Sequence, residues 1–125
     1  FSFQIPQGKI FKVPNNLSNI RREMEIKSII ANNKPDGVFV SDDLTAILTM
    51  KIAKQLKLQV PEDLKIIGYD GTTFTENFIP ELTTIKQPID EIANLIVDVL
   101  IKKIKGEKTS KDYVLPISLL PGGSI

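Results

Sequence analysis

The chain has 125 residues, which is enough for one domain with its own hydrophobic core. Its 16 basic and 15 acidic residues leave a formal net charge of +1, which excludes the strongly positive field of a non-specific nucleic-acid binder. Cysteine and histidine are both absent, so the sequence offers no disulfide framework, no thiolate chemistry and no imidazole base.

The sequence carries no sign of export or of a membrane span. No apolar run reaches the length that a bilayer requires. The opening residues, 1–4, lack the charged and apolar regions of a signal peptide, and residues 1–8 are predicted to form a loop. We therefore expect a cytoplasmic protein, and because position 1 is Phe rather than Met we expect a part of a longer one.

The first third of the chain predicts a strand followed by a helix. Polar and apolar side chains alternate over residues 9–13, which is typical of a strand. Asn16 or Ser18 is placed to cap a helix that begins directly afterwards. The turn residues at 32–37 end that helix. Its apolar side chains form an imperfect stripe, made of Leu17, Ile20, Met24, Ile29 and Ile30.

A short buried strand at 38–40 leads into a second helix over about 43–58. Asp42 and Asp43 stand at its start, where carboxylates satisfy free N–H groups and the helix dipole. The apolar side chains of this helix cover two of its sides, which predicts burial on both sides. One side then meets either another subunit or other elements of the same chain. These apolar residues are Leu44, Ala46, Ile47, Leu48, Met50, Ile52 and Ala53.

The segment after this helix is predicted to form a buried strand with a carboxylate at its carboxyl end. Pro61 marks a turn, and the apolar residues within 64–67 are rich in β-branched side chains. Gly68 permits close backbone approach, and Asp70 follows at the carboxyl end of the strand. Ligands bind at that end in open parallel sheets.

The remaining third predicts a strand, a long helix and further strand-like segments. Residues 82–86 form the strand, and Asp90 is placed to cap a helix that ends at Gly106. Residues 113–115 and 117–120 are strand-like. Since strands alternate with helices, the sequence predicts an α/β fold with a parallel sheet flanked by helices.

Two enzyme-like interpretations of the acidic residues each require a residue that this sequence does not have. A phosphatase of the haloacid dehalogenase type needs a nucleophilic Asp two residues before Asp70, where this chain has Gly68. A response-regulator receiver needs an acidic pair after its first strand to hold magnesium, and the residues at 14–16 supply none. Asp42, Asp43 and Asp70 could still gather at neighbouring strand tips, so the receiver stays open as an alternative.

Polar side chains follow the predicted strands at their carboxyl ends. They are Ser41 and Asp42, then Asp70, then Gln87. Carboxylates and amides can each bond two hydroxyl groups of a sugar, and Ile89 could cover the sugar ring. The pattern therefore predicts a site for a neutral polyol. Each of these groups could instead only cap a helix or a turn.

Three motifs in order resemble the effector-binding region of the LacI family of bacterial transcriptional repressors, over residues 15–121. They are PDGVFVSDDLTA, VPEDLKIIGYD and IPELTTIKQPIDEI. The resemblance implies a two-lobed, periplasmic-binding-protein-like fold. Residues 1 to about 86 would belong to the C-terminal lobe, and about 87–120 would cross to the N-terminal lobe. The DNA-binding domain of the family is absent, so operator DNA would be reached only through that missing N-terminal part.

The resemblance also implies functional residues. Asp42 stands where the family usually has Asn, and Asp70 matches the ligand-binding Asp of the family. Gln87 and Ile89 lie at the crossing between lobes, and Leu17 lies near the group that packs on the ligand. The family forms homodimers through the helix after the Asn-Asp pair, for which the candidates here are Ile47, Leu48, Lys51 and Phe78.

The sequence thus predicts an effector-binding and dimerisation fragment of a LacI-type repressor, sensing a small molecule that we expect to be a sugar. No enzyme, cofactor, metal site or membrane partner is predicted. The alternative is a sugar-binding protein of a transport system, which shares the fold. The apolar helix 43–58 and the Leu-Thr-Thr-Ile-Lys-Gln-Pro motif favour the repressor.

Overall fold

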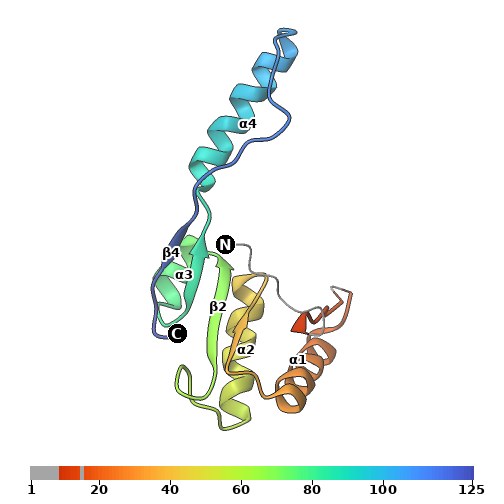
Figure 1. Ribbon diagram of the computed structural model, residues 1–125, viewed down its shortest axis with the longest axis vertical. Helices are drawn as coiled ribbons and strands as arrows, with labels where there is room; N and C mark the ends of the chain where they lie inside the picture. Colours follow the sequence, from red (N-terminus) through yellow and green to blue (C-terminus); the bar gives the residue numbers. More distant parts are fainter. Residues whose placement is uncertain (1–8, 15) are drawn as a thin grey trace.

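The computed structural model describes residues 9–14 and 16–125, and it combines four helices with a four-stranded sheet (Figure 1). The predicted loop at 1–8 lies outside the described residues. The elements in chain order are α1 (Asn19–Asn33), β1 (Gly37–Phe39), α2 (Asp43–Gln55), β2 (Lys65–Asp70), α3 (Thr73–Phe78), β3 (Thr83–Lys86), α4 (Ile89–Ile104) and β4 (Ser118–Leu120).

The sheet has the strand order β1-β2-β3-β4. β1, β2 and β3 are parallel to one another, as predicted, so their carboxyl ends share one edge. β4 runs antiparallel to β3, because the chain returns along α4 and re-enters the sheet from that shared edge. The predicted α/β fold with a parallel sheet is therefore confirmed for β1 to β3, and only the last strand departs from it.

One face of the sheet is buried against helices. α2 packs on β2, and α1 packs on α2 rather than on the sheet (Figure 1). The two sides of α2 therefore meet two different elements of the same chain. The buried apolar core between them is made of Ile26, Ile30, Ala46, Ile52, Ala53, Leu64, Ile66 and Leu82.

The opposite face of the sheet has an apolar surface that the described residues leave largely open. Register places Phe39, Ile67, Tyr69, Ile85 and Leu119 on this face. Phe39 and Tyr69 form an edge-to-face ring contact there with centroids 6.3 Å apart. Phe39 is nevertheless 62% exposed, so this face lacks the covering layer that parallel strands normally have.

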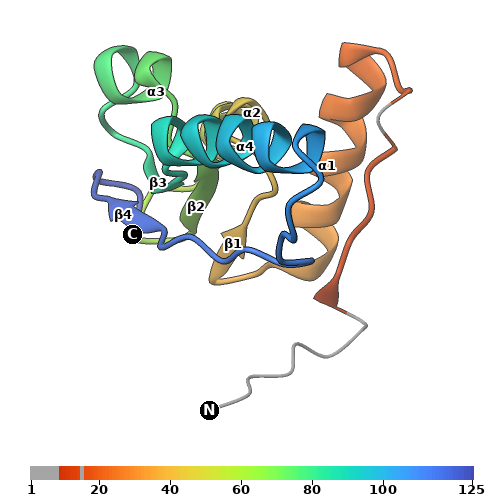
Figure 2. The same cartoon turned by 90° about the horizontal axis from the view of Figure 1, so that it is seen from above.

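Helix α4 and the segment that returns from it project away from the sheet (Figure 1), and the returning segment runs back beside the helix (Figure 2). α4 has no buried residue. Its apolar side chains gather on one side of the helix more clearly than those of α1 or α2, yet Ile96, Leu100 and Ile104 are exposed. No helix among the described residues is long and apolar enough to cross a bilayer.

Several predicted boundaries shift in the structure. Residues 9–13 form no strand, because no described strand runs beside them to accept their hydrogen bonds. Residues 113–115 likewise stay irregular. Pro88 rather than Asp90 is the N-cap of α4, and Asp90 lies in its first turn. α3 was not predicted, since its six residues are too few to show a helical period.

The first helix begins as predicted and buries a different face. Ser18 is its N-cap and accepts the N–H of Arg21, which confirms one of the two proposed caps. Ile26 and Ile30 are the buried residues, whereas Ile20 and Met24 are 74% and 65% exposed. The sequence pattern therefore indicated the helix correctly, but not all of its core-facing positions.

Candidate functional site

Asp70 ends β2 in a backbone conformation that few residues other than glycine adopt. Its φ angle is 129°, and Gly71 follows with a φ of 59°. A Cβ atom on Gly71 would lie 2.5 Å from the Cα of Lys86, so only glycine fits this turn. Non-glycine residues at positive φ are costly and concentrate at functional sites. The turn thus aims Asp70 at the carboxyl edge of the sheet.

The side chains of Asp70 and Gln87 are brought together across that edge. β2 and β3 pair with Asp70 opposite Lys86, so Gln87 comes next to Asp70 one residue after β3 ends. Gln87 Nε2 donates to Asp70 Oδ1 over 2.8 Å, and the backbone N–H of Gln87 donates to the carbonyl oxygen of Asp70 over 3.2 Å. Two of the predicted ligand residues are therefore neighbours.

This pairing determines what the two side chains can offer a ligand. A carboxylate only accepts, so the amide nitrogen of Gln87 must face Asp70 and its Oε1 must point elsewhere. Oδ2 of Asp70 and Oε1 of Gln87 then both remain as acceptors. The pair is suited to groups that donate hydrogen bonds, such as hydroxyls.

Asp42 lies at the tip of β1 and is engaged as the N-cap of α2. Its Oδ1 accepts the N–H of Thr45 over 2.8 Å. Its Oδ2 accepts the hydroxyls of Thr45 and Ser41 over 2.8 and 3.2 Å. Capping explains this residue without a ligand, so a binding role for Asp42 stays a prediction.

Ile89 and Leu17 lie in different parts of the structure. Ile89 is the first residue of α4, is 59% exposed, and donates its N–H to the carbonyl oxygen of Gln87 over 3.0 Å. Leu17 is half-buried in the bend before α1, where its N–H meets the carbonyl oxygen of Pro14. Ile89 is thus adjacent to the Asp70–Gln87 pair, whereas Leu17 belongs to the bend before α1.

Asp43 is the residue of this region that sequence reasoning missed. It is only 3% exposed and accepts three hydrogen bonds, from the Gly71 N–H and from the hydroxyls of Thr75 and Thr84. The sequence signal was the doubled Asp at the helix start, since one N-cap needs only one carboxylate.

The four candidate dimer residues divide into two groups. Ile47 and Leu48 are partly buried against the chain's own core, and Lys51 forms an ion pair of 3.0 Å with Glu23 of α1. Phe78 is 69% exposed and contacts Phe74, with ring centroids 5.2 Å apart. Of the four, Phe78 therefore offers the most free surface, and all four stay predictions as interface residues.

The ion pair of Lys51 belongs to a small network between α1 and α2. Gln55 donates to Glu23 Oε1 over 2.7 Å beside the lysine. The hydrogen bond from Gln55 and then that from Lys51 lower the pKa of the Glu23 carboxyl. Lys51 thus has a structural role inside this chain.

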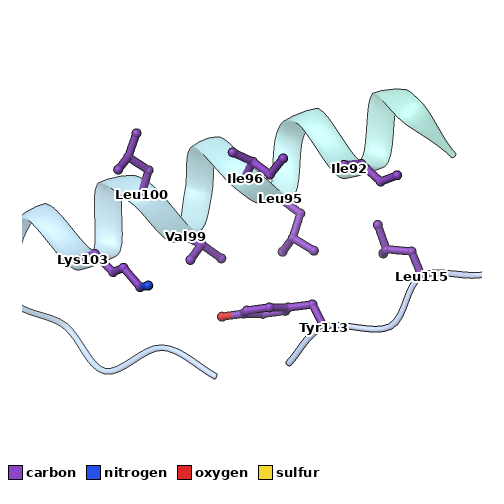
Figure 3. Close-up of a pocket in the computed structure, with 8 residues that line it drawn as sticks. All are labelled: Ile92, Leu95, Ile96, Val99, Leu100, Lys103, Tyr113 and Leu115. Carbon is purple, nitrogen blue, oxygen red and sulfur yellow. The ribbon is translucent and has the colours of Figure 1, made fainter. Parts of the chain in front are cut away.

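A separate apolar groove of about 450 Å³ lies along α4 (Figure 3). Tyr113 and Leu115 of the returning segment face Leu95 and Val99 of the helix there. The Asp70–Gln87 pair does not line this groove. Because its lining is apolar apart from the polar groups of Lys103 and Tyr113, the groove has the character of an uncovered hydrophobic core rather than of a sugar site.

Comparison with known proteins matches residues 6–125 to the periplasmic-binding-protein-like domain family. The chain belongs to this family. A sucrose operon repressor of Streptococcus mutans is 60% identical over all 125 residues, which make up 39% of that protein. This likeness confirms the resemblance to LacI-type repressors.

Solved structures agree with this assignment. A periplasmic binding protein/LacI transcriptional regulator of Alkaliphilus metalliredigens in complex with D-xylulofuranose is 35% identical, with a TM-score of 0.65 over 82% of this chain and 38% of that chain. The lac repressor dimer bound to operator and an anti-inducer is 28% identical, with a TM-score of 0.73 over 82% of this chain and 32% of that chain. The chain thus spans 32–39% of the length of these three proteins.

Proposed function

We propose that this chain is the effector-binding and dimerisation part of a cytoplasmic, sugar-responsive transcriptional repressor of the LacI type. The observation that carries the proposal is the hydrogen-bonded Asp70–Gln87 pair at the carboxyl edge of the parallel strands. That edge is where open α/β sheets bind ligands. It presents acceptors for sugar hydroxyls beside the apolar side chain of Ile89.

The proposed effector is a neutral sugar related to sucrose. The repressor that shares 60% identity with this chain is named for a sucrose operon. The acceptor oxygens of Asp70 and Gln87 suit hydroxyl groups, whereas a phosphate would meet like charge. Lys86, the basic residue nearest along β3, is already paired with Glu76 over 2.7 Å. These facts favour a neutral sugar over a sugar phosphate.

The proposed division into lobes follows the two separate parts of the structure. In this division, residues up to about 86 form the C-terminal lobe together with β4, which pairs with β3, and residues from about 87 up to β4 belong to the N-terminal lobe. In support, α4 projects from the sheet with its apolar side uncovered, as expected for a helix whose packing partners lie elsewhere in a longer protein. Gln87 and Ile89 lie at the crossing, so a ligand held there could change how the lobes close.

The repressor would act as a homodimer that reaches operator DNA through a domain this chain does not contain. The exposed Phe74 and Phe78 of α3, together with Leu44 of α2, offer an apolar surface for the second copy. Effector binding would shift the balance between lobe arrangements, and hence the spacing of the two DNA-binding heads. A transport protein is not favoured, because the relatives reported above are repressors or regulators.

The test is calorimetric titration of the complete repressor that carries this chain with sucrose, fructose, glucose and their phosphates. We expect saturable binding of a neutral sugar and release of a labelled operator duplex at the same concentrations. Tighter binding of a sugar phosphate would contradict the proposed effector class. Sugar binding by a protein that has no affinity for operator DNA would contradict the proposed role as a repressor.

A further inference from the structure

The carboxylate of Asp43 is buried where four elements of the fold meet. Asp43 is the first residue of α2, and its three hydrogen-bond donors come from the turn after β2, from α3 and from β3. Oδ2 accepts the Gly71 N–H over 3.1 Å and the Thr75 hydroxyl over 2.6 Å. Oδ1 accepts the Thr84 hydroxyl. The N-cap role belongs to Asp42, so capping does not explain Asp43.

The backbone around Asp43 leaves no room for another arrangement. A Cβ atom on Gly68 would lie 2.6 Å from Asp43 Oδ1, so the strand approaches the carboxylate as closely as glycine permits. Burying an ion is costly unless hydrogen bonds replace its water, and here three donors do so. The carboxylate and the turn at 70–71 are thus fixed relative to each other.

The contact with Gly71 connects this buried group to the proposed effector site. Gly71 directly follows Asp70, whose φ of 129° is unfavourable unless neighbouring contacts hold it. A hydrogen bond to the next N–H is such a contact. Without it, the peptide between residues 70 and 71 would be held only through its carbonyl oxygen, which accepts the Gln87 N–H over 3.2 Å. The peptide could then relax towards a less strained conformation and carry the Asp70 side chain away from Gln87.

We propose that Asp43 is a positioning residue, which sets the orientation of Asp70 towards the effector by holding the N–H of Gly71. The affinity part of this inference rests on the proposed function, whereas the geometric part does not. Asp43 itself is buried beneath the site and does not touch the ligand. Its effect on affinity is exerted through Asp70.

The chemistry of the three donors predicts which substitutions preserve this role. Hydroxyl groups can rotate to accept a hydrogen bond, but a backbone N–H cannot. In Asp43→Asn, the amide oxygen can keep the Gly71 N–H while the NH₂ group donates to the Thr84 hydroxyl. Asp43→Ala removes the acceptor altogether. Asn should therefore rescue the function that Ala loses.

The first measurement needs no ligand. Amide hydrogen exchange followed by NMR is expected to show slow exchange for Gly71, and faster exchange for Thr73, which opens α3 on the surface. In Asp43→Ala the Gly71 amide should exchange about as fast as that of Thr73, while Asp43→Asn should keep most of the protection. Rapid exchange of Gly71 in the unsubstituted protein would overturn the inference.

The second measurement is sugar affinity of the complete repressor, with Thr49→Val as the matched control. Thr49 is also buried in α2, and its hydroxyl donates only to the carbonyl oxygen of Thr45 over 2.8 Å. We expect Asp43→Ala to raise the Kd for the sugar about tenfold or more, because a misplaced Asp70 would lose one hydrogen bond between its charged carboxylate and the sugar. Asp43→Asn and Thr49→Val should stay within about threefold.

A background of Asp70→Asn separates positioning from general destabilisation. If Asp43 acts through Asp70, Asp43→Ala should still lower the melting temperature there but should change the Kd much less. Equal losses in both backgrounds, or an equal loss with Thr49→Val, would overturn the inference. Should Asp43→Ala not fold, Asp43→Ser, whose side chain is too short to reach Gly71, takes its place. If no sugar binds the unsubstituted repressor, the proposed function fails, while the exchange measurement still decides the geometry.

Discussion

Gln87 donates a hydrogen bond to Asp70 across a sequence separation of 17 residues. The bond exists because β2 and β3 are adjacent and parallel, so that both chains leave the sheet at one edge. It also orients the Gln87 amide and leaves acceptor oxygens on both residues.

Replacing Asp70 by alanine should weaken sugar binding while leaving the fold intact, because the side chain lies at a strand tip rather than in the core. Loss of hydrogen bonds to a charged group, worth about 1.5–3 kcal/mol each, corresponds to at least about tenfold in Kd. Calorimetric titration of the complete repressor measures this. Asp36→Ala, an exposed carboxylate before β1 at the opposite end of the strands, is the control, and equal affinities of both variants would remove Asp70 from the site.

Phe78→Glu should convert a dimeric repressor into monomers, because a charge would be placed in an apolar contact between the subunits. Light scattering coupled to size-exclusion chromatography gives the mass directly. Phe78 is a better probe than Ile47, whose partial burial in the chain's own core would mix dimer loss with unfolding. Phe11→Glu, on a segment outside α2 and α3, serves as the control; a dimer that persists in Phe78→Glu would contradict the proposed interface.

Ser124→Ala should lower the free energy of unfolding by about 1–3 kcal/mol, the typical result of leaving a buried polar group unpaired. Ser124 Oγ donates to the carbonyl oxygen of Ile66 over 2.6 Å and accepts the Thr83 N–H over 2.8 Å. The tail therefore ties β2 to β3 at the end of the sheet away from Asp70. Urea denaturation of Ser124→Ala and of the exposed Ser28→Ala should give different midpoints, and identical midpoints would show that this link contributes nothing.

In the chain of residues 1–125, the amides of α4 should exchange with solvent faster than those of α2. α4 has no buried residue, whereas α2 buries Ala46, Ile52 and Ala53. Hydrogen-exchange mass spectrometry would compare the two helices, first in this chain and then in the complete repressor. Protection of α4 should rise in the complete repressor if another lobe covers it, and no rise would argue against the proposed division into lobes.

The sequence predicted well those features that depend on neighbouring residues. Ser18 and Asp42 cap their helices as their residue types and positions indicated, and the β-branched run before Gly68 is a strand that buries Ile66 on one face of the sheet. The position of Asp70 at a strand tip followed from the same local pattern. Prediction failed for residues 9–13, because alternation of side chains creates a strand only when a partner strand lies alongside.

Local chemistry by itself determined the helices α1, α2 and α4, the strands β1 to β3 and the carboxylate at the tip of β2, since caps, turns and periodicity act over a few residues. Only the tertiary structure decided that β4 pairs antiparallel, that Gln87 bonds Asp70, and that Asp43 is buried as an acceptor for Gly71, Thr75 and Thr84. These relationships join residues between 17 and 41 positions apart. They arise from which strands are neighbours and how closely a helix packs on them, which no short stretch of sequence specifies.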